Sequence, residues 1–296
     1  MSKKNNKLSL IFSFLIFFIG ASIFFYPTIS DLWNKHVNNQ LEVKYSDKIS
    51  KENTVEKDRI LNKAIEYNKQ HLVNTVKDVF SNNEYSKDNV YYSLLNPNND
   101  GVMGILEIPK INQKLIIWHG VGKEALENGC GHIEGTSLPV GGEGTHAVLA
   151  SHSGFTNARL FTDLDKLKED DLFYIQVLDK KLEYKVDKIS VVLPSDLSQL
   201  SIEKGEDLVT LVTCTPYGVN SHRLLVRGKR MNHFNNSKEI KNRDIDIDNS
   251  NKNKKIYSYI LLILVSLIAI IIVNKIVIDK SKKEKSDNIF TKLKQL

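Results

Sequence analysis

Residues 208–230, LVTLVTCTPYGVNSHRLLVRGKR, contain two short apolar runs separated by a polar segment. The outer parts, LVTLVT and LLVR, combine apolar and β-branched side chains, which are typical of buried strands. The middle, TPYGVNS, is rich in residues that form turns. A strand, a loop and a strand place Cys214, at the end of the first strand, near Arg223, at the start of the second.

A thiol beside a permanent cation favours nucleophilic chemistry. Only the thiolate is nucleophilic, and a neighbouring positive charge lowers the pKa of a cysteine such as Cys214. The guanidinium of Arg223 could also stabilise an oxyanion on an attacked carbonyl group. The alternative is that Cys214 is a buried cysteine that packs as a small apolar side chain.

A cysteine nucleophile needs a general acid and base, which is usually a histidine. His152 is one candidate, because residues 145–150 form an apolar run that ends at a Ser-His-Ser-Gly turn, so His152 would lie at a strand end as Cys214 does. Spacing alone leaves three other candidates open: His132, His146 and His222.

Two longer motifs carry a resemblance to a known family. Residues 213–226, TCTPYGVNSHRLLV, and residues 131–142, GHIEGTSLPVGG, resemble those of class C sortases, which polymerise pilins. The resemblance extends over residues 26–230. Matched position by position, it implies that the catalytic residues are Cys214, His152 and Arg223.

The resemblance also implies a fold and a reaction. The fold would be mainly β, a closed sortase-type barrel with helices N-terminal to it. The reaction would be cleavage of an LPXTG-like sorting signal after threonine through a thioester, followed by transfer to a lysine amine of another pilin subunit, with no cofactor. Two alternatives stay open: a sortase that attaches surface proteins to cell-wall peptide, and a membrane-tethered binding module without catalytic activity.

Class C sortases often carry a lid with an Asp-Pro-aromatic motif over the active site. In this chain the lid would occupy residues 76–96, where Asp78, Val79 and Phe80 stand in the motif without its proline. Asp78 would pair with Arg223 while Phe80 covers the thiol. The alternative is an ordinary surface linker.

Charge and hydropathy predict a membrane protein. Three lysines in residues 1–7 contribute +3, and seven lysines against three acids in residues 274–296 contribute +4. Because the net charge of the whole chain is +6, the residues between these two ends carry −1. This nearly neutral charge argues against nucleic-acid binding. Residues 8–26 and 257–273 are uncharged and apolar, and each is about long enough to cross a bilayer. The flanking lysines predict cytoplasmic termini and an extracellular middle, in the membrane of a Gram-positive-type bacterium, unless the first segment is a cleaved signal peptide.

The rest of the chain falls into segments of distinct character. Residues 50–75 have the periodicity of an amphipathic helix. Seven strands are expected, at residues 104–109, 115–118, 145–150, 172–178, 182–192, 208–213 and 224–227. No spacing typical of a metal site occurs, and Cys130 and Cys214 are predicted to be free thiols. The predicted segments are a leader (1–7), a membrane anchor or signal (8–26), a helical region with the lid (27–100), the catalytic barrel (101–231), a polar tether (232–255), a transmembrane helix (256–278) and a basic cytoplasmic tail (279–296).

Overall fold

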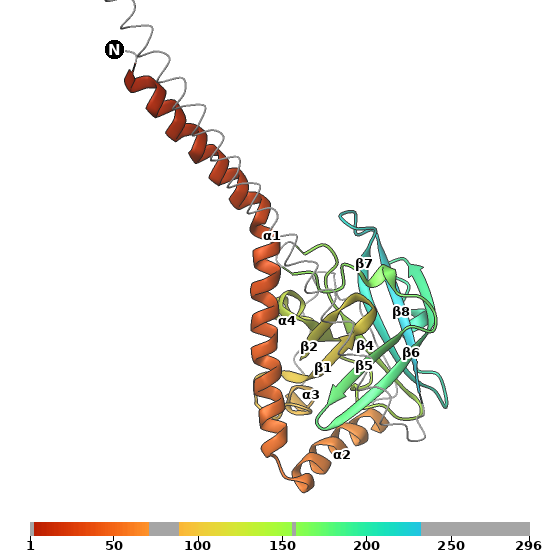
Figure 1. Ribbon diagram of the computed structural model, residues 1–296. Helices are drawn as coiled ribbons and strands as arrows, with labels where there is room; N and C mark the ends of the chain where they lie inside the picture. Colours follow the sequence, from red (N-terminus) through yellow and green to blue (C-terminus); the bar gives the residue numbers. More distant parts are fainter. Residues whose placement is uncertain (1–2, 71–88, 156–157, 232–296) are drawn as a thin grey trace, which may run out of the picture. The chain divides into compact units, whose positions relative to one another are not determined.

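The computed structural model describes residues 3–70, 89–155 and 158–231. Eight strands form a closed barrel in the order β1-β2-β3-β4-β7-β8-β6-β5 (Figure 1). The strands are β1 (Val102–Ile108), β2 (Gln113–His119), β3 (Cys130–His132), β4 (Thr145–Ala150), β5 (Leu172–Val177), β6 (Lys180–Val192), β7 (Asp207–Thr215) and β8 (His222–Arg230). The predicted mainly β barrel is therefore confirmed.

The strand that the sequence analysis missed is β3. It has only three residues, one of them Gly131, and so shows neither an apolar run nor a clear alternation. It pairs in parallel with β2 and antiparallel with β4, which bridges the first part of the barrel to the second. The other seven strands lie where they were predicted, although most are one to three residues longer.

Two apolar clusters lie on opposite faces of the sheet around β7. The larger cluster receives residues from all eight strands and includes Val209 and Leu211 of β7. The smaller cluster includes Val212 of β7, together with Val148 of β4 and Leu225 of β8. Because successive side chains of a strand point to opposite faces, the larger cluster fills the barrel and the smaller one lies on its outer face.

Helix α1 (Lys3–Lys51) runs without interruption from the apolar N-terminal segment to the barrel. The helix continues past residue 26, where we predicted that the membrane segment ends. It contains Pro27, and Figure 1 shows a bend about halfway along it. A proline is the usual cause of such a bend. Its last turns pack on the barrel. The hydroxyl of buried Tyr45 donates to the carbonyl of Met103 at 3.0 Å and accepts from the amide of Leu178 at 2.8 Å.

The described residues contain three shorter α-helices: α2 (Thr54–Gln70), α3 (Asn89–Ser93) and α4 (Lys123–Asn128). Helix α2 lies within the amphipathic segment that we predicted, and its Leu61 and Ala64 are buried. Asn68 attaches it to the barrel, because its side-chain amide both donates to and accepts from the backbone of Leu138, at 3.0 and 2.7 Å. Short 3-10 turns occur at Pro109–Ile111, Leu164–Lys166 and Ser198–Leu200.

Several predicted segments lie outside the described residues. These are Asp78 and Phe80 with most of the predicted lid, the polar tether from residue 232, the second transmembrane segment and the basic tail.

Candidate functional site

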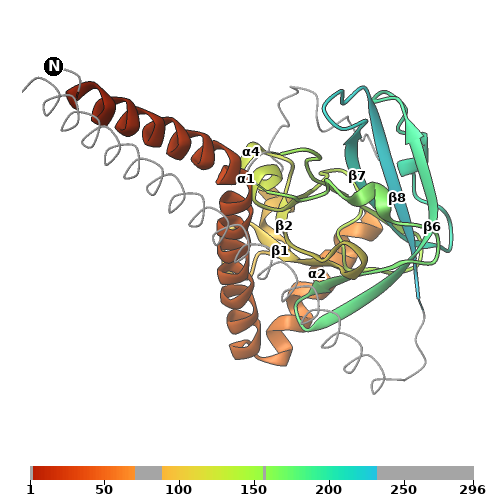
Figure 2. The same cartoon turned by 45° about the horizontal axis from the view of Figure 1, so that its top comes forward.

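Cys214 and Arg223 lie directly opposite each other on neighbouring strands. Strands β7 and β8 lie side by side (Figure 2) and pair antiparallel. Cys214 and Arg223 are partners in that register. Arg223 is in turn the partner of Val192, at the end of β6. Opposed residues in an antiparallel pair have neighbouring side chains on the same face, so the thiol and the guanidinium share one surface of the sheet.

His152 lies level with Cys214 on the other side of β7. Strand β4 pairs in parallel with β7, and Ala150 is the partner of Val212. The pairing continues beyond β4: the amide of Ser151 donates to the carbonyl of Val212 at 3.1 Å, and the hydroxyl of Thr213 donates to the carbonyl of Ser151 at 2.8 Å. His152 follows Ser151 directly, so it lies at the same end of the sheet as Cys214, two residues beyond the Ala150–Val212 pair.

This row of His152, Cys214 and Arg223 is on the outer face of the barrel. Cys214 follows Val212 by two residues and so points to the same side, where the smaller apolar cluster lies. Cys214 and Arg223 are 9% and 8% exposed. The row is thus largely shielded from water at the carboxyl ends of the parallel strands β4 and β7.

The loop between β7 and β8 fixes the arginine. It begins with a cis peptide bond between Thr215 and Pro216, and Asn220 has a left-handed backbone with φ of 60°. The Nη1 atom of Arg223 donates to the carbonyl groups of Asn220 and His222, both at 3.1 Å. Backbone acceptors therefore hold one end of the guanidinium group, which orients its remaining N–H donors.

His152 is half-buried against an aromatic ring. Its imidazole stacks on Phe155, with ring centroids 5.5 Å apart and planes inclined by 18°. Burial lowers the pKa of His152 below the ordinary value, while the negative charge of Glu127 on α4 acts in the opposite direction. A histidine with a lowered pKa is mostly neutral near pH 7, the form that can accept a proton.

Two hydrogen bonds and one ring contact hold the loop that carries His152. The amide of Phe161 donates to the carbonyl of His152 at 3.0 Å, and the amide of Gly154 donates to the hydroxyl of Thr162 at 3.1 Å. Gly154 has a φ of +75°, and a Cβ atom there would lie 2.8 Å from the ring of Tyr217. The aromatic ring thus links the loop after β4 to the loop between β7 and β8.

The other three histidines do not share this position. His132 is fully buried: its Nδ1 accepts from the hydroxyl of Tyr91 at 2.9 Å, and its Nε2 donates to the carbonyl of Ser137 at 2.8 Å. His146 lies at the opposite end of β4 from His152. His222 is the partner of Thr215, next to Cys214, so its side chain is on the other face of the sheet.

The second cysteine, Cys130, is enclosed in the core. Both thiols are free, as the sequence predicted. Burial raises the pKa of Cys130, and its thiol lies 3.5 Å from the carbonyl of Ile116. A buried thiol of this kind is unreactive. Of the two cysteines, Cys214 is therefore the candidate nucleophile, because it lies at the rim of the barrel.

The connection between β6 and β7 is fastened along the same outer face. The hydroxyl of Ser190 donates to Gln199 at 2.8 Å, and the Nδ1 atom of His146 donates to the carbonyl of Ser201 at 2.8 Å. Arg227 forms ion pairs with Asp187 and Glu203, both at 2.6 Å. Because this connection leaves β6 next to Val192, it forms one wall beside Arg223.

Sequence reasoning missed the supporting residues of the site. Glu127, Phe155 and Tyr217 come from three segments that are far apart in the chain, and their contacts follow from the strand pairing. The short aromatic signal in residues 152–155, His-Ser-Gly-Phe, is the one feature of the sequence that could have indicated the ring stack.

Comparisons with known proteins agree with this geometry. Residues 106–231 match the sortase domain family. The chain is 26% identical over 205 residues to sortase A of Streptococcus agalactiae serotype III, covering 68% of this chain and 76% of that protein. Two similar crystal structures are sortase C1 of Streptococcus agalactiae, with 44% identity, a TM-score of 0.59 and coverage of 64% of this chain and 94% of that one, and sortase C of Streptococcus pneumoniae, with 38% identity, a TM-score of 0.61 and coverage of 66% and 97%.

These similarities reach well beyond a shared fold, because identity near 40% extends over almost the whole of each solved chain. These two structural neighbours are sortases C, as the motifs around Cys214 predicted. The chain belongs to the sortase family of cysteine transpeptidases and is consistent with its class C.

Proposed function

We propose that this protein polymerises pilin subunits by cysteine transpeptidation, with Cys214, Arg223 and His152 as its catalytic residues. The observation that carries the proposal is the pairing of β4, β7 and β8, which sets Cys214 opposite Arg223 and brings the end of β4, two residues before His152, beside Val212. Similarity to sortases C supports the choice of a pilin substrate, since the Streptococcus pneumoniae structure is described in terms of pilin substrate specificity.

In the first half of the reaction Cys214 attacks the substrate as a thiolate. Its sulfur forms a bond with the carbonyl carbon of the threonine in an LPXTG-like sorting signal, and Arg223 donates hydrogen bonds to the developing oxyanion. His152, in its protonated form, gives a proton to the departing amine. The peptide C-terminal to the threonine leaves, and the threonine remains on Cys214 as a thioester.

In the second half a lysine amine of another pilin subunit attacks the thioester. His152 takes a proton from this amine, and the bond between carbon and sulfur breaks to release the thiolate of Cys214. The product is an isopeptide bond between two subunits. Water would divert the thioester to hydrolysis, so the low exposure of Cys214 favours the transfer.

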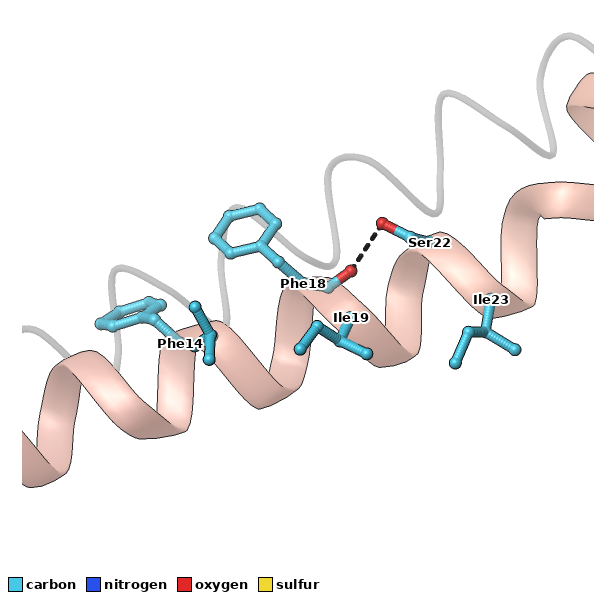
Figure 3. A pocket seen from close by; sticks show the side chains of 6 residues that line it. Phe14, Phe18, Ile19, Ser22 and Ile23 are labelled. Atoms are coloured by element: carbon cyan, nitrogen blue, oxygen red, sulfur yellow. Dashed lines mark hydrogen bonds between the residues drawn. The ribbon is translucent and has the colours of Figure 1, made fainter.

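The N-terminal part of α1 is proposed to anchor the enzyme in the membrane. Among the described residues, α1 is the one helix long and apolar enough to span a bilayer. Figure 3 shows the side chains of Phe14, Phe18, Ile19 and Ile23 projecting from this helix. The hydroxyl of Ser22 donates to the carbonyl of Phe18 at 2.8 Å, so this polar group has its partner within the helix.

The proposed topology places the catalytic barrel outside the cell. Residues 256–278 would form a second transmembrane helix behind the polar tether, with both termini in the cytoplasm. Lysines follow this segment and precede the first one, which is the bias expected of cytoplasmic ends.

A lid is proposed in the part of residues 76–96 that precedes α3, because Tyr91 of α3 is fully buried. In this lid Asp78 would pair with Arg223 and Phe80 would lie over the thiol. Valine in place of proline at position 79 would leave this loop more mobile. Replacing Asp78 and Phe80 with alanine should then increase the rate at which a thiol reagent modifies Cys214. An unchanged rate would argue for an ordinary linker.

The decisive test of the chemistry uses the full chain in detergent with an LPXTG-type peptide. Mass spectrometry should detect an acyl adduct on Cys214 in the wild type and in Cys130→Ala, and none in Cys214→Ala. If Cys214→Ala keeps full function, the protein is a binding module instead. Incubation with pilin substrate should give a ladder of crosslinked subunits; single products joined to cell-wall peptide would indicate the anchoring type of sortase.

A further inference from the structure

Strand β6 continues beyond its neighbour β5 and so has a free edge. Residues 180–185 pair with β5, and Val186 adds two backbone hydrogen bonds to residues 170–171, at 2.9 and 2.8 Å. The rest of β6 pairs with β8, which lies on its other side (Figure 2). In the part of the chain that the structure describes, no backbone group bonds to residues 187–192 from the side of β5.

A β-bulge marks the point where this edge becomes free. The register with β8 shifts between Val186 and Lys188, so Asp187 is the extra residue. Its carboxylate accepts from the Nε and Nη2 atoms of Arg227, at 3.1 and 2.6 Å, which fixes the bulge. Bulges and charged side chains usually protect a sheet edge from pairing with another chain. Both stand at the start of the free edge, whereas residues 189–193 contain no charge.

Three apolar side chains along this edge are exposed. Ile189, Val191 and Leu193 are 36%, 60% and 56% exposed. Val192, between the last two, belongs to the smaller apolar cluster and is the partner of Arg223. Because side chains alternate along a strand, the three exposed ones lie on the face opposite the catalytic row. An exposed apolar edge is the kind of surface to which another chain can add a strand.

The connection from β6 to β7 leaves this edge open. Strand β8 lies between β6 and β7, so the connection runs away from the free edge. It follows the outer face, where Gln199 accepts from the hydroxyl of Ser190 and Leu200 packs in the smaller cluster. A strand added at the free edge would lie three strand spacings, or about 14 Å, from Cys214 on β7.

We propose that the free edge of β6 binds an extended apolar strand of the protein substrate, in a segment outside its sorting signal. The added strand would form backbone hydrogen bonds with residues 188–192 and place every second side chain beside Ile189 and Val191. The inference rests on the transpeptidase function proposed above and deepens it, because it names a second contact with the same substrate.

The small size of the edge favours a substrate over a second copy of this chain. A stable dimer buries roughly 800 Å² on each partner, and three partly exposed side chains on one short segment supply much less. A weak contact is still effective for a substrate whose sorting signal is held at Cys214, because the linked segment then has a high local concentration. The enzyme should therefore prefer substrates that carry an extended segment near the sorting signal.

The test compares two synthetic peptides that end in the same LPXTG-type signal. In the first, a flexible Gly-Ser linker of about ten residues, which spans about 17 Å on average, connects the signal to an alternating Thr-Val segment. In the second, Gly and Ser replace the Thr-Val segment. With the full chain in detergent, the first peptide should acylate Cys214 with a kcat/KM about five- to tenfold higher than the second. Equal values would overturn the proposal.

Variants at one exposed position show where the strand binds. Val191→Lys should remove the advantage of the first peptide, since a lysine on an edge strand opposes strand addition. It should leave the reaction of the second peptide unchanged, because Val191 faces away from the catalytic row. Val191→Ile should keep the advantage, and so should Val55→Lys, a control on α2 where Val55 is 79% exposed. An advantage that persists in Val191→Lys would exclude binding at this edge.

Two other results would each have a separate meaning. If neither peptide forms an adduct on Cys214, the proposed transpeptidase function is wrong, and the inference fails with it. If sedimentation in detergent finds a dimer of the full chain that Val191→Lys dissociates, the edge binds a second copy, and the inference alone is wrong.

Discussion

Two influences act in opposite directions on the pKa of His152, and they set its protonation state. Burial lowers its pKa, and the charge of Glu127 raises it. A lowered pKa means that the protonated form, which gives a proton to the leaving amine, disappears at lower pH than for an ordinary histidine. The proposed mechanism therefore depends on a small fraction of imidazolium at neutral pH.

Glu127→Gln should shift the pH profile of the enzyme. Removing the carboxylate removes an influence that raises the pKa, so the alkaline limb of Cys214 acylation should move to lower pH. The rate of acylation near pH 7.5 should therefore fall, because less of His152 is protonated there. Rapid-quench mass spectrometry of the acyl adduct over a pH series measures this. Glu124→Gln, on the exposed side of the same helix, is the control, and identical profiles for both variants would contradict the assignment.

Arg223→Lys should separate two roles of the arginine. Lysine keeps the positive charge beside Cys214 but loses the planar fork of donors that the loop carbonyls orient. We expect kcat/KM to fall about 10²-fold to 10³-fold, while the pH dependence of alkylation of Cys214 changes little. Arg223→Ala should change both measurements. Equal activity of the lysine variant and the wild type would show that charge alone suffices.

At the scale of elements, the site depends on contact between two loops. The loop after β4 carries His152, and the loop between β7 and β8 orients Arg223. The ring of Tyr217 lies over Gly154 and so joins the two loops. The Cβ atom of any other residue at position 154 would clash with this ring. A change in this contact should therefore affect catalysis more than folding.

Gly154→Ala should reduce activity beyond its effect on stability. Gly154 and Gly205 both have positive φ, +75° and +81°, so alanine at either costs about 1–2 kcal/mol of stability. Only at Gly154 does the new methyl group displace the ring of Tyr217, which should lower turnover about tenfold or more. Denaturant unfolding and peptide turnover of Gly154→Ala and Gly205→Ala make the comparison. Equal turnover of the two variants would show that the loop contact is not needed.

At the scale of the whole molecule, buried histidines make the barrel sensitive to acid. Burial lowers the pKa of His132 to about 4, and burial also lowers the pKa of His119 and His146. Protonation of His132 would remove the acceptor for the hydroxyl of Tyr91. The unfolded chain, in which histidine has a pKa near 6.5, binds this proton more readily than the folded chain does.

The free energy of unfolding should therefore fall as pH decreases from about 6.5 toward 4. Above this range His132 is neutral in both states and its contribution is fully present; the loss through His132 alone approaches about 3 kcal/mol at pH 4. Urea unfolding of the detergent-solubilised chain at several pH values measures it. His132→Gln lacks a titrating group and should show a flatter dependence, even if it is less stable throughout. A parallel dependence in both proteins would place the acid sensitivity elsewhere.

The sequence by itself located most of the strands and the pairing of Cys214 with Arg223, while the choice of a closed barrel came from the resemblance to sortases. A strand is recognised from a run of apolar and β-branched residues that are adjacent in the sequence, and for this reason seven strands could be located. Cys214 and Arg223 are separated by a single loop, so their pairing could be predicted as well. The motifs around them resembled those of class C sortases, and this indicated His152. Strand β3 was missed because three residues are too short for a periodic signal.

Only the tertiary structure decided how the row is assembled and supported. Spacing in the sequence could not distinguish four candidate histidines. The parallel pairing of β4 with β7 places His152 at the same end of the sheet as Cys214, and His146 at the other end of β4. Glu127, Phe155, Tyr217 and the bond from Arg159 to Asp31 join segments separated by up to 128 positions in the chain. Such contacts depend on closure of the barrel and on the length of α1, which no local pattern in the sequence encodes.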